Sequence, residues 1–162
     1  MKTELQNQIN DCTAELNDID SKMSSLSPLD KTKVYLTNYA LIRACGTIEH
    51  VYRSIVADFF LSTPVPQIHN YLEKTVRNGS MSATYDNMSG LLGKFDDAWQ
   101  RNFKNVVDAH PDRTRLRDSL RSLVTNRHAF AHGGVPTATF QDIKNYYNDA
   151  LTVINIFDSI VT

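Results

Sequence analysis

The chain has 162 residues, of which 41% are hydrophobic, and this is enough for one domain with a hydrophobic core over residues 1–162. Its formal net charge of −1 gives no indication of a partner. Two cysteines and no CxxC pair exclude a disulfide framework and a cysteine-based zinc site. The polar N-terminus does not resemble a secretory signal, and no apolar run approaches the roughly 20 residues of a membrane span. We therefore expect a cytoplasmic protein that does not interact with a membrane.

The charges are unevenly distributed along the chain. Residues 1–30 carry two lysines against six acidic residues, which gives a local net charge of −4. Residues 94–132 carry eight lysines and arginines against five aspartates, which gives a local net charge of +3. This distribution favours a site for a polyanion far from the N-terminus.

The pattern of apolar residues is helical throughout, without sustained two-residue alternation. The first helix is expected over about 3–25, with apolar residues three or four positions apart: Leu5, Ile9, Cys12, Leu16, Ile19 and Met23. We expect this N-terminal helix, within residues 1–26, to be an appendage of the domain or an element of a dimer. Ser27 and Pro28 then predict the start of a second helix, with serine as the cap and proline at the first helical position.

The second helix, over roughly 28–62, is the longest and most hydrophobic. Its apolar seam consists of Val34, Leu41, Cys45, Ile48, Tyr52, Ile55 and Phe59, and it is widened by Tyr39, Ile42, Val56 and Phe60. Gly46 lies inside this helix and indicates a position where another helix approaches closely. The Thr63-Pro64-Val65-Pro66 stretch ends the helix, because proline cannot continue its hydrogen-bond ladder.

Four further helical segments follow. We expect a short helix over 66–77, one or two joined helices over 83–109, and a long helix over about 112–132 that ends at Gly133. A last helix begins after Thr139, where Thr139-Phe140-Gln141-Asp142 resembles a capping box. The predicted fold is all-α, an up-and-down helical bundle of five to six helices.

The 112–132 segment carries the chemistry that stands out in this sequence. Its apolar stripe is made by Leu116, Leu120, Leu123 and Val124, yet Arg127 lies on the line of that stripe, one turn after Leu123. Burying an unpaired guanidinium is costly, so an arginine there needs a partner or a task. His128 and His132 lie one turn apart on the adjoining flank of the same helix.

The residues Arg127-His128 followed three positions later by His132, late in a long helix, resemble the signature of the HEPN superfamily. That signature is an arginine, a polar residue, and a histidine after four to six intervening positions. The stretch from Arg43 to Glu49 is similar to an arginine-to-glutamate stretch on an early helix of the RiboL-PSP-type HEPN proteins. The resemblance covers about residues 30–160, and it departs from the commonest pattern in having histidine rather than asparagine at 128.

The resemblance implies a homodimeric endoribonuclease that needs no metal ion or other cofactor. Cleaving RNA needs a base for the 2′-hydroxyl, a cation at phosphorus and an acid for the 5′-oxygen, and histidine and arginine suit these tasks. Expected roles are as follows: catalytic, Arg127, His128 and His132; RNA-binding, Arg113, Arg117 and Arg121; supporting, Arg43 and Glu49. The family also implies a setting in prokaryotic defence or a toxin–antitoxin system, with an antitoxin or regulatory protein as a further partner.

Other interpretations of the same residues stay open at the level of sequence. Arg127 can be structural, paired with Glu49 or a carbonyl, in a non-catalytic module of the same fold that binds RNA, a nucleotide or a protein. His128 and His132 also form an HxxxH pair that could bind zinc, although no third ligand is evident. The arginine run at 113–121 can be a solvated helix face balanced by Asp112 and Asp118. Whether Arg127 and His132 reach solvent together distinguishes catalysis from these alternatives.

Overall fold

A computed structural model describes residues 1–62 and 64–162, and these residues form helices and loops with no strand among them. The all-α prediction is confirmed. In chain order the elements are α1 (Thr3–Ser25), α2 (Thr32–Phe59), a 3-10 turn η1 (Phe60–Ser62), α3 (Pro66–Leu72), a π-helical turn η2 (Glu73–Arg77), α4 (Tyr85–Gly93), α5 (Asp97–Ala109), α6 (Arg113–Ala131) and α7 (Phe140–Ile160). Within the described residues, no helix is long and apolar enough to cross a membrane.

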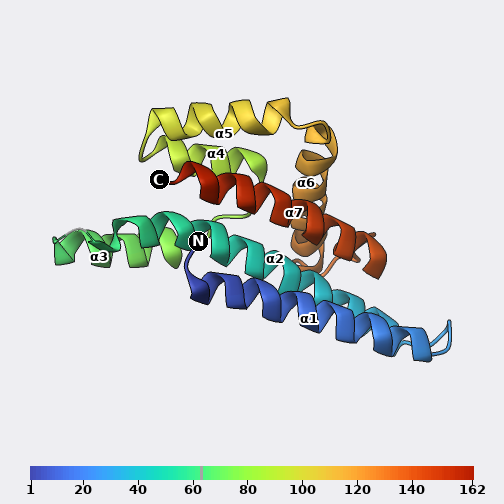
Figure 1. The fold of residues 1–162 in the computed structure, drawn as a ribbon. Helices are drawn as coiled ribbons and strands as arrows, with labels where there is room; N and C mark the ends of the chain where they lie inside the picture. The colour runs from blue at the N-terminus through green and yellow to red at the C-terminus, as the bar shows by residue number, and fades with distance from the viewer. Residues whose placement is uncertain (63) are drawn as a thin grey trace.

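The two long helices α2 and α7 pack against each other and organise the molecule (Figure 1). The α1 helix lies along α2 on one side, and the pair α4 and α5 lies on the other side, with α5 against α7. The α6 helix crosses α7 at a steep angle and also contacts α2. One core joins all of these helices, and its largest fully buried side chains include Tyr52, Tyr147, Phe103, Phe157, Leu41, Ile48, Leu120 and Leu123. This arrangement brings α6 and α2, which are distant in the sequence, into contact.

The α1 helix has the predicted bounds and is built into the core. Its buried residues recur every three or four positions and face α2: Leu5, Ile9, Cys12, Leu16 and Ile19. An ion pair strengthens the same interface, because Arg43 of α2 donates from Nε (2.8 Å) and Nη2 (3.0 Å) to the Glu15 carboxylate. The hydrogen bond from Arg43 holds the pKa of Glu15 below its usual value. Arg43 therefore fastens α1 to α2.

The start of α2 differs from the prediction, because the helix begins at Thr32 and not at Pro28. Residues 27–30 form a turn instead, in which the Asp30 amide donates to the Ser27 carbonyl (3.1 Å). The Asp30 carboxylate then accepts the amide hydrogen of Thr32 (2.8 Å). A serine before a proline is a signal for turns as well as for helix caps, and here the turn prevails. Downstream, the 83–109 segment separates into α4 and α5 because the Asp96 side chain caps α5 through the amide of Trp99 (3.1 Å).

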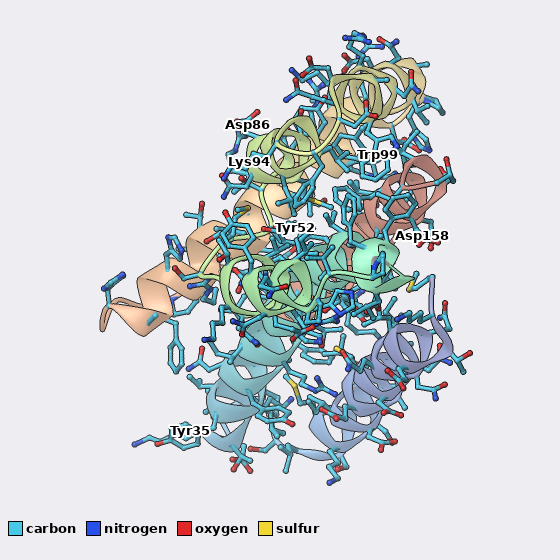
Figure 2. All side chains as sticks on the ribbon, turned by 90° about the vertical axis from the view of Figure 1, so that its left-hand side faces the viewer. Tyr35, Tyr52, Asp86, Lys94, Trp99 and Asp158 are labelled. Carbon is cyan, nitrogen blue, oxygen red and sulfur yellow. The ribbon has the colours of Figure 1, made fainter. Side chains whose placement is uncertain are left out.

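The N-terminal half of α2 carries apolar side chains that the rest of the chain leaves exposed. Val34, Tyr39 and Ile42, which were expected in or beside the buried seam, are exposed, and so is Tyr35. Figure 2 shows Tyr35 pointing away from the ribbon, whereas Tyr52, further along the same helix, lies among the other helices. The prediction for Gly46 is wrong within this chain, because no atom of another helix lies within 4 Å of the place where a Cβ would stand. These residues form an open face on α2.

Candidate functional site

The α6 helix presents its C-terminal turn at the surface through a regular helix ending. Leu116, Leu120, Leu123 and Val124 bury one face of α6 in the core. Gly133 has a φ of 77°, and the amide of Gly134 donates to the carbonyl of Ala129 (2.8 Å), which closes the last turn. Glycine adopts this left-handed conformation without the steric cost that a side chain would add. The chain therefore turns away sharply just after His132.

Asn126 holds the loop that leads out of this turn, and it was not predicted from the sequence. Its buried side-chain oxygen accepts the amide hydrogens of Thr137 (2.8 Å) and Ala138 (2.9 Å), and its Nδ2 donates to the carbonyl of Ser122 (2.9 Å). The side chain replaces the carbonyl partners that these two amides would have in regular structure. Asn126 thus fixes the path of the chain from α6 to α7, next to Arg127.

We expect Asn126→Ala to lower the free energy of unfolding by about 2–3 kcal/mol, because it leaves two amide donors without their acceptor. Urea denaturation followed by circular dichroism measures this change. Asn155→Ala, at an exposed position in α7, is the matched control and should shift the free energy by less than about 0.5 kcal/mol. Equal stability of the two variants would contradict the role of Asn126.

Arg127 extends from α6 to α2, where its Nη2 donates to the Glu49 carboxylate. The Arg127 side chain is 25% exposed and that of Glu49 is 15% exposed, so the pair lies at the edge of the core and is partly open to solvent. Burial alone would lower the pKa of Arg127, but its hydrogen bond to Glu49 and the negative charge of that carboxylate outweigh burial and raise the pKa. Arg127 therefore carries its charge at every physiological pH, and Glu49 holds it in place.

Cys45 lies one helical turn before Glu49 and is fully buried. Its thiol is 3.6 Å from Glu49 Oε1 and donates to it. Burial, followed by the charge of Glu49, raises the pKa of the Cys45 thiol to about 12. Cys45 thus stays a neutral thiol that supports the carboxylate.

Ser82 joins the site from the loop between η2 and α4, and no sequence motif marks it. Arg127 Nη2 donates to the Ser82 hydroxyl oxygen (3.3 Å), and that oxygen is also 3.2 Å from Nε2 of His128. The backbone of this loop is held by the core, because the Tyr52 hydroxyl donates to the carbonyls of Met81 (2.9 Å) and Ser82 (3.3 Å). Ser82 is therefore a bridge between the two motif residues Arg127 and His128.

The two histidines of the motif are both exposed at the end of α6. Their ring centroids are 6.3 Å apart with an interplanar angle of 82°. In the part of the chain that the structure describes, no group of three or more His, Cys, Asp or Glu side chains is arranged to hold a metal ion. Arg127 and His128 thus meet at Ser82, and His132 lies beside His128, so a guanidinium and two exposed imidazoles gather in a cluster at the end of α6.

The arginines expected to bind RNA are each balanced by an aspartate or a carbonyl. Arg117 pairs with Asp108 and lies over the ring of Tyr85, with its Cζ atom 4.0 Å from the ring centroid. Arg121 pairs with Asp118 (2.6 Å), and Arg113 donates to the carbonyl of Asp108 (3.4 Å).

A surface hollow of about 340 Å³ lies beside these arginines and is lined by Thr84, Tyr85, Asp86, Arg117 and Arg121. Two of the three arginines thus line one hollow, which the loop from Ser82 to Thr84 connects to the histidine cluster.

The two supporting residues from α2 have different surroundings. Glu49 contacts Arg127, whereas Arg43 contacts Glu15 of α1 and the hydroxyl of Thr47 (3.0 Å). Six residues of α-helix turn the side-chain direction through about 600°, so the two residues lie about 120° apart around α2. The structure therefore does not bring Arg43 to Arg127, and its ion pair with Glu15 belongs to the α1–α2 interface.

The open face of α2 reaches the motif helix. An apolar hollow of about 450 Å³ is lined by Tyr35, Asn38, Tyr39, Ile42 and Phe130, and Phe130 lies between the two motif histidines in the sequence. Tyr35, Ile42 and Glu49 are seven residues apart on α2, so they share one side of that helix, and the apolar stripe leads to the partner of Arg127. We call Tyr35, Tyr39, Ile42 and Phe130 the apolar patch.

In a comparison with known families, the family model described as RiboL-PSP-HEPN matches residues 7–162. Comparison with curated proteins and with solved structures gives no match. The matched segment contains α6 with its cluster, Glu49, Ser82 and the apolar patch.

Proposed function

Since the chain belongs to the RiboL-PSP-HEPN family, we propose that it is an endoribonuclease that cleaves RNA without a metal ion. The observation that carries the proposal is the juxtaposition of Arg127, held by Glu49, with two exposed imidazoles on the same helix end. This set combines a permanent cation with two imidazoles, the side chain most often used as a general acid or base. It matches what transesterification of an RNA phosphodiester requires.

In the proposed reaction the 2′-hydroxyl oxygen attacks phosphorus and the bond from phosphorus to the 5′-oxygen breaks. The base takes the 2′-hydroxyl proton, and the acid gives a proton to the departing 5′-oxygen. The products are a 2′,3′-cyclic phosphate and a 5′-hydroxyl end. No redox change occurs, so proton transfer and charge stabilisation are the only tasks of the protein.

Each residue of the cluster is suited to one of these tasks. Arg127 donates to Glu49 and Ser82 through Nη2, and its Nη1 and Nε donate no hydrogen bond to a described residue. These two donors suit the non-bridging oxygens of the phosphate. His132 is the proton carrier, and His128 orients the substrate. Charged hydrogen bonds at phosphorus typically contribute about 10²–10³-fold to the rate, and a general base or acid about 10²–10⁴-fold.

We further propose that the active species is a homodimer formed through the apolar patch. Each chain offers one His132, whereas the reaction uses a base and an acid, so a second copy would supply the second proton carrier. The patch is exposed, it includes Phe130 of the motif helix, and it leads to Glu49. Gly46, on the same open face, leaves room for a helix of a second copy to approach closely. A dimer seated on this patch brings the two α6 ends together.

The test of the proposed activity is incubation of the purified protein with labelled single-stranded RNA in the presence of EDTA. We expect the RNA to be cut into fragments with 2′,3′-cyclic phosphate ends and a DNA of the same sequence to stay intact, because DNA lacks the attacking 2′-hydroxyl. Arg127→Ala should lower the rate by about 10²-fold, since it removes the cation at phosphorus. Intact RNA with the wild-type protein, or equal cutting of DNA, would contradict the proposal.

The second candidate is a non-catalytic module of the same fold that binds RNA, a nucleotide or a protein. Two observations favour it: Arg127 is engaged by Glu49, and the arginines of α6 are balanced by aspartates. Filter binding separates the two candidates, because the module would retain RNA without cutting it. A setting in prokaryotic defence or a toxin–antitoxin system, with an antitoxin as partner in the cytoplasm, follows from the family resemblance. Growth arrest on expression, relieved by His132→Ala, is the result expected in that setting.

A further inference from the structure

Ser82 lies in a loop whose backbone is fixed independently of the motif. Besides the hydrogen bonds from Tyr52, the carbonyl of Ser82 accepts the side-chain amide of Asn87 (2.9 Å) and the backbone amide of Thr84 (2.9 Å). Tyr52 is fully buried and its ring meets that of Phe157 edge to face. The position of the Ser82 hydroxyl is thus set by the core and by the start of α4.

The hydrogen-bonding capacities of the three groups favour one direction for the bonds between them. Arginine can only donate, so Ser82 Oγ accepts from Arg127 Nη2. The serine hydroxyl keeps one hydrogen to donate and a second lone pair to accept with, and His128 Nε2 lies 3.2 Å from it. A neutral imidazole accepts only at its unprotonated nitrogen. Accepting from a charged guanidinium makes this hydroxyl a stronger donor and a weaker acceptor, so the favoured chain of bonds runs from Arg127 to Ser82 and on to Nε2 of His128.

We propose that Ser82 is a positioning residue that fixes neutral His128 as the Nδ1–H tautomer. Free imidazole side chains favour the opposite tautomer, with hydrogen on Nε2, so the serine changes which nitrogen presents a hydrogen. This inference rests on the proposed ribonuclease function for its role in the reaction, although the tautomer itself does not depend on a substrate. The tautomer gives the two histidines different roles in the proposed reaction.

In this arrangement His128 acts as a hydrogen-bond donor and His132 as the proton carrier. The Nε2 lone pair of His128 is occupied by Ser82, so that nitrogen is not free to take the 2′-hydroxyl proton. Its Nδ1–H is left to donate to a phosphate oxygen next to Arg127. His132 makes no side-chain hydrogen bond to a described residue, so both of its ring nitrogens stay accessible for proton transfer. A serine from a distant loop thus assigns different roles to two histidines one turn apart.

The test combines a spectroscopic and a kinetic measurement on Ser82→Ala, Ser82→Thr and the control Ser80→Ala, which changes an exposed serine of the same loop. Nitrogen-15 NMR of histidine-labelled protein, at a pH where the rings are neutral, reports the tautomer of His128. We expect Nδ1–H in the wild type, Ser82→Thr and Ser80→Ala, and a shift towards Nε2–H in Ser82→Ala. We expect kcat for RNA cleavage to fall about 3–10-fold in Ser82→Ala with KM little changed, as for loss of one hydrogen bond.

The NMR measurement and the kinetic measurement test different parts of the proposal, so each can contradict its part alone. An unchanged tautomer in Ser82→Ala overturns the inference whether or not the protein cleaves RNA. A changed tautomer with unchanged kcat overturns the positioning role but keeps the ribonuclease. Wild-type protein that does not cleave RNA refutes the proposed function, while the NMR result still decides whether Ser82 sets the tautomer. Thermal unfolding of each variant shows that the fold is intact, and rescue by threonine ties the effect to the hydroxyl.

Discussion

Replacing His132 with alanine is expected to reduce RNA cleavage by about 10²–10⁴-fold, the usual contribution of a general acid or base. If the homodimer uses one His132 as base and the other as acid, a single substitution in the gene removes both proton carriers. The fall should then lie at the upper end of that range. The measurement is the initial rate of cleavage of a fluorescently labelled RNA, compared at equal protein concentration.

The stability of His132→Ala should stay close to that of the wild type. His132 is exposed beyond the last residue of α6, and its backbone amide, which donates to the carbonyl of His128 (3.1 Å), is kept in the variant. Asn105→Ala, an exposed change on α5, is the control and should cleave RNA at the wild-type rate. RNA binding should also persist in His132→Ala, because Arg127 remains. Cleavage at the wild-type rate by His132→Ala would remove this residue from the mechanism.

The bounds of a helix could be predicted from the sequence where its apolar periodicity, its cap and the following turn all indicated the same ends. The α1 stripe repeats every three or four residues and is followed by a turn, and the α7 start has a full capping box between Thr139 and Asp142. The α6 helix was equally well defined, because a stripe of leucines leads to a double glycine. Where signals conflicted, as at Ser27 and Pro28, local hydrogen bonds made by Asp30 favoured a turn over a helix cap.

Only those residues of the site that lie on a single helix could be predicted from the sequence. Arg127 and His128 are adjacent and His128 and His132 lie one turn apart, so helix geometry places His132 next to His128, although Arg127 and His132 lie about 140° apart around the helix. Their partners come from elsewhere: Glu49 from α2 through helix packing, and Ser82 from a loop fixed by Tyr52. Ser82 lies 45 residues from Arg127 in the chain, and an isolated serine in a loop carries no sequence signal. The separation of Arg43 from Glu49 could have been predicted from the sequence, since six residues place the two side chains about 120° apart around a helix.

The apolar face of α2 shows the limit of periodicity as a guide to burial. Val34, Tyr39 and Ile42 follow the helical pattern of the buried seam, yet the chain leaves them exposed. An apolar periodicity indicates that one helix face is more stable when buried, but it does not indicate whether this chain or another chain buries it. The proposed second copy accounts for a seam that continues beyond the monomer core.

Ile42→Asp is expected to convert the dimer to a monomer and to abolish RNA cleavage with it. In a symmetric interface each copy places one carboxylate on the apolar patch, so the dimer would bury two unpaired charges. A cost of about 3–5 kcal/mol for an unpaired buried charge corresponds to a dissociation constant at least about 10²-fold weaker. Analytical ultracentrifugation over a range of concentrations measures this constant, and the cleavage assay is run on the same samples.

Val106→Asp is the matched control, because Val106 is also a β-branched residue on a helix and is 44% exposed, close to the 41% of Ile42. It lies on α5, outside the apolar patch and on the other side of α7 from α1 and α2 (Figure 1). A general effect of surface charge would change both variants alike, whereas loss of the proposed interface changes Ile42→Asp alone. A monomeric wild type that cleaves RNA would refute the dimer and leave the cluster on α6 as a site within one chain. An active dimer of Ile42→Asp would instead move the interface to another face, because two aspartates could not be buried against each other without a measurable loss.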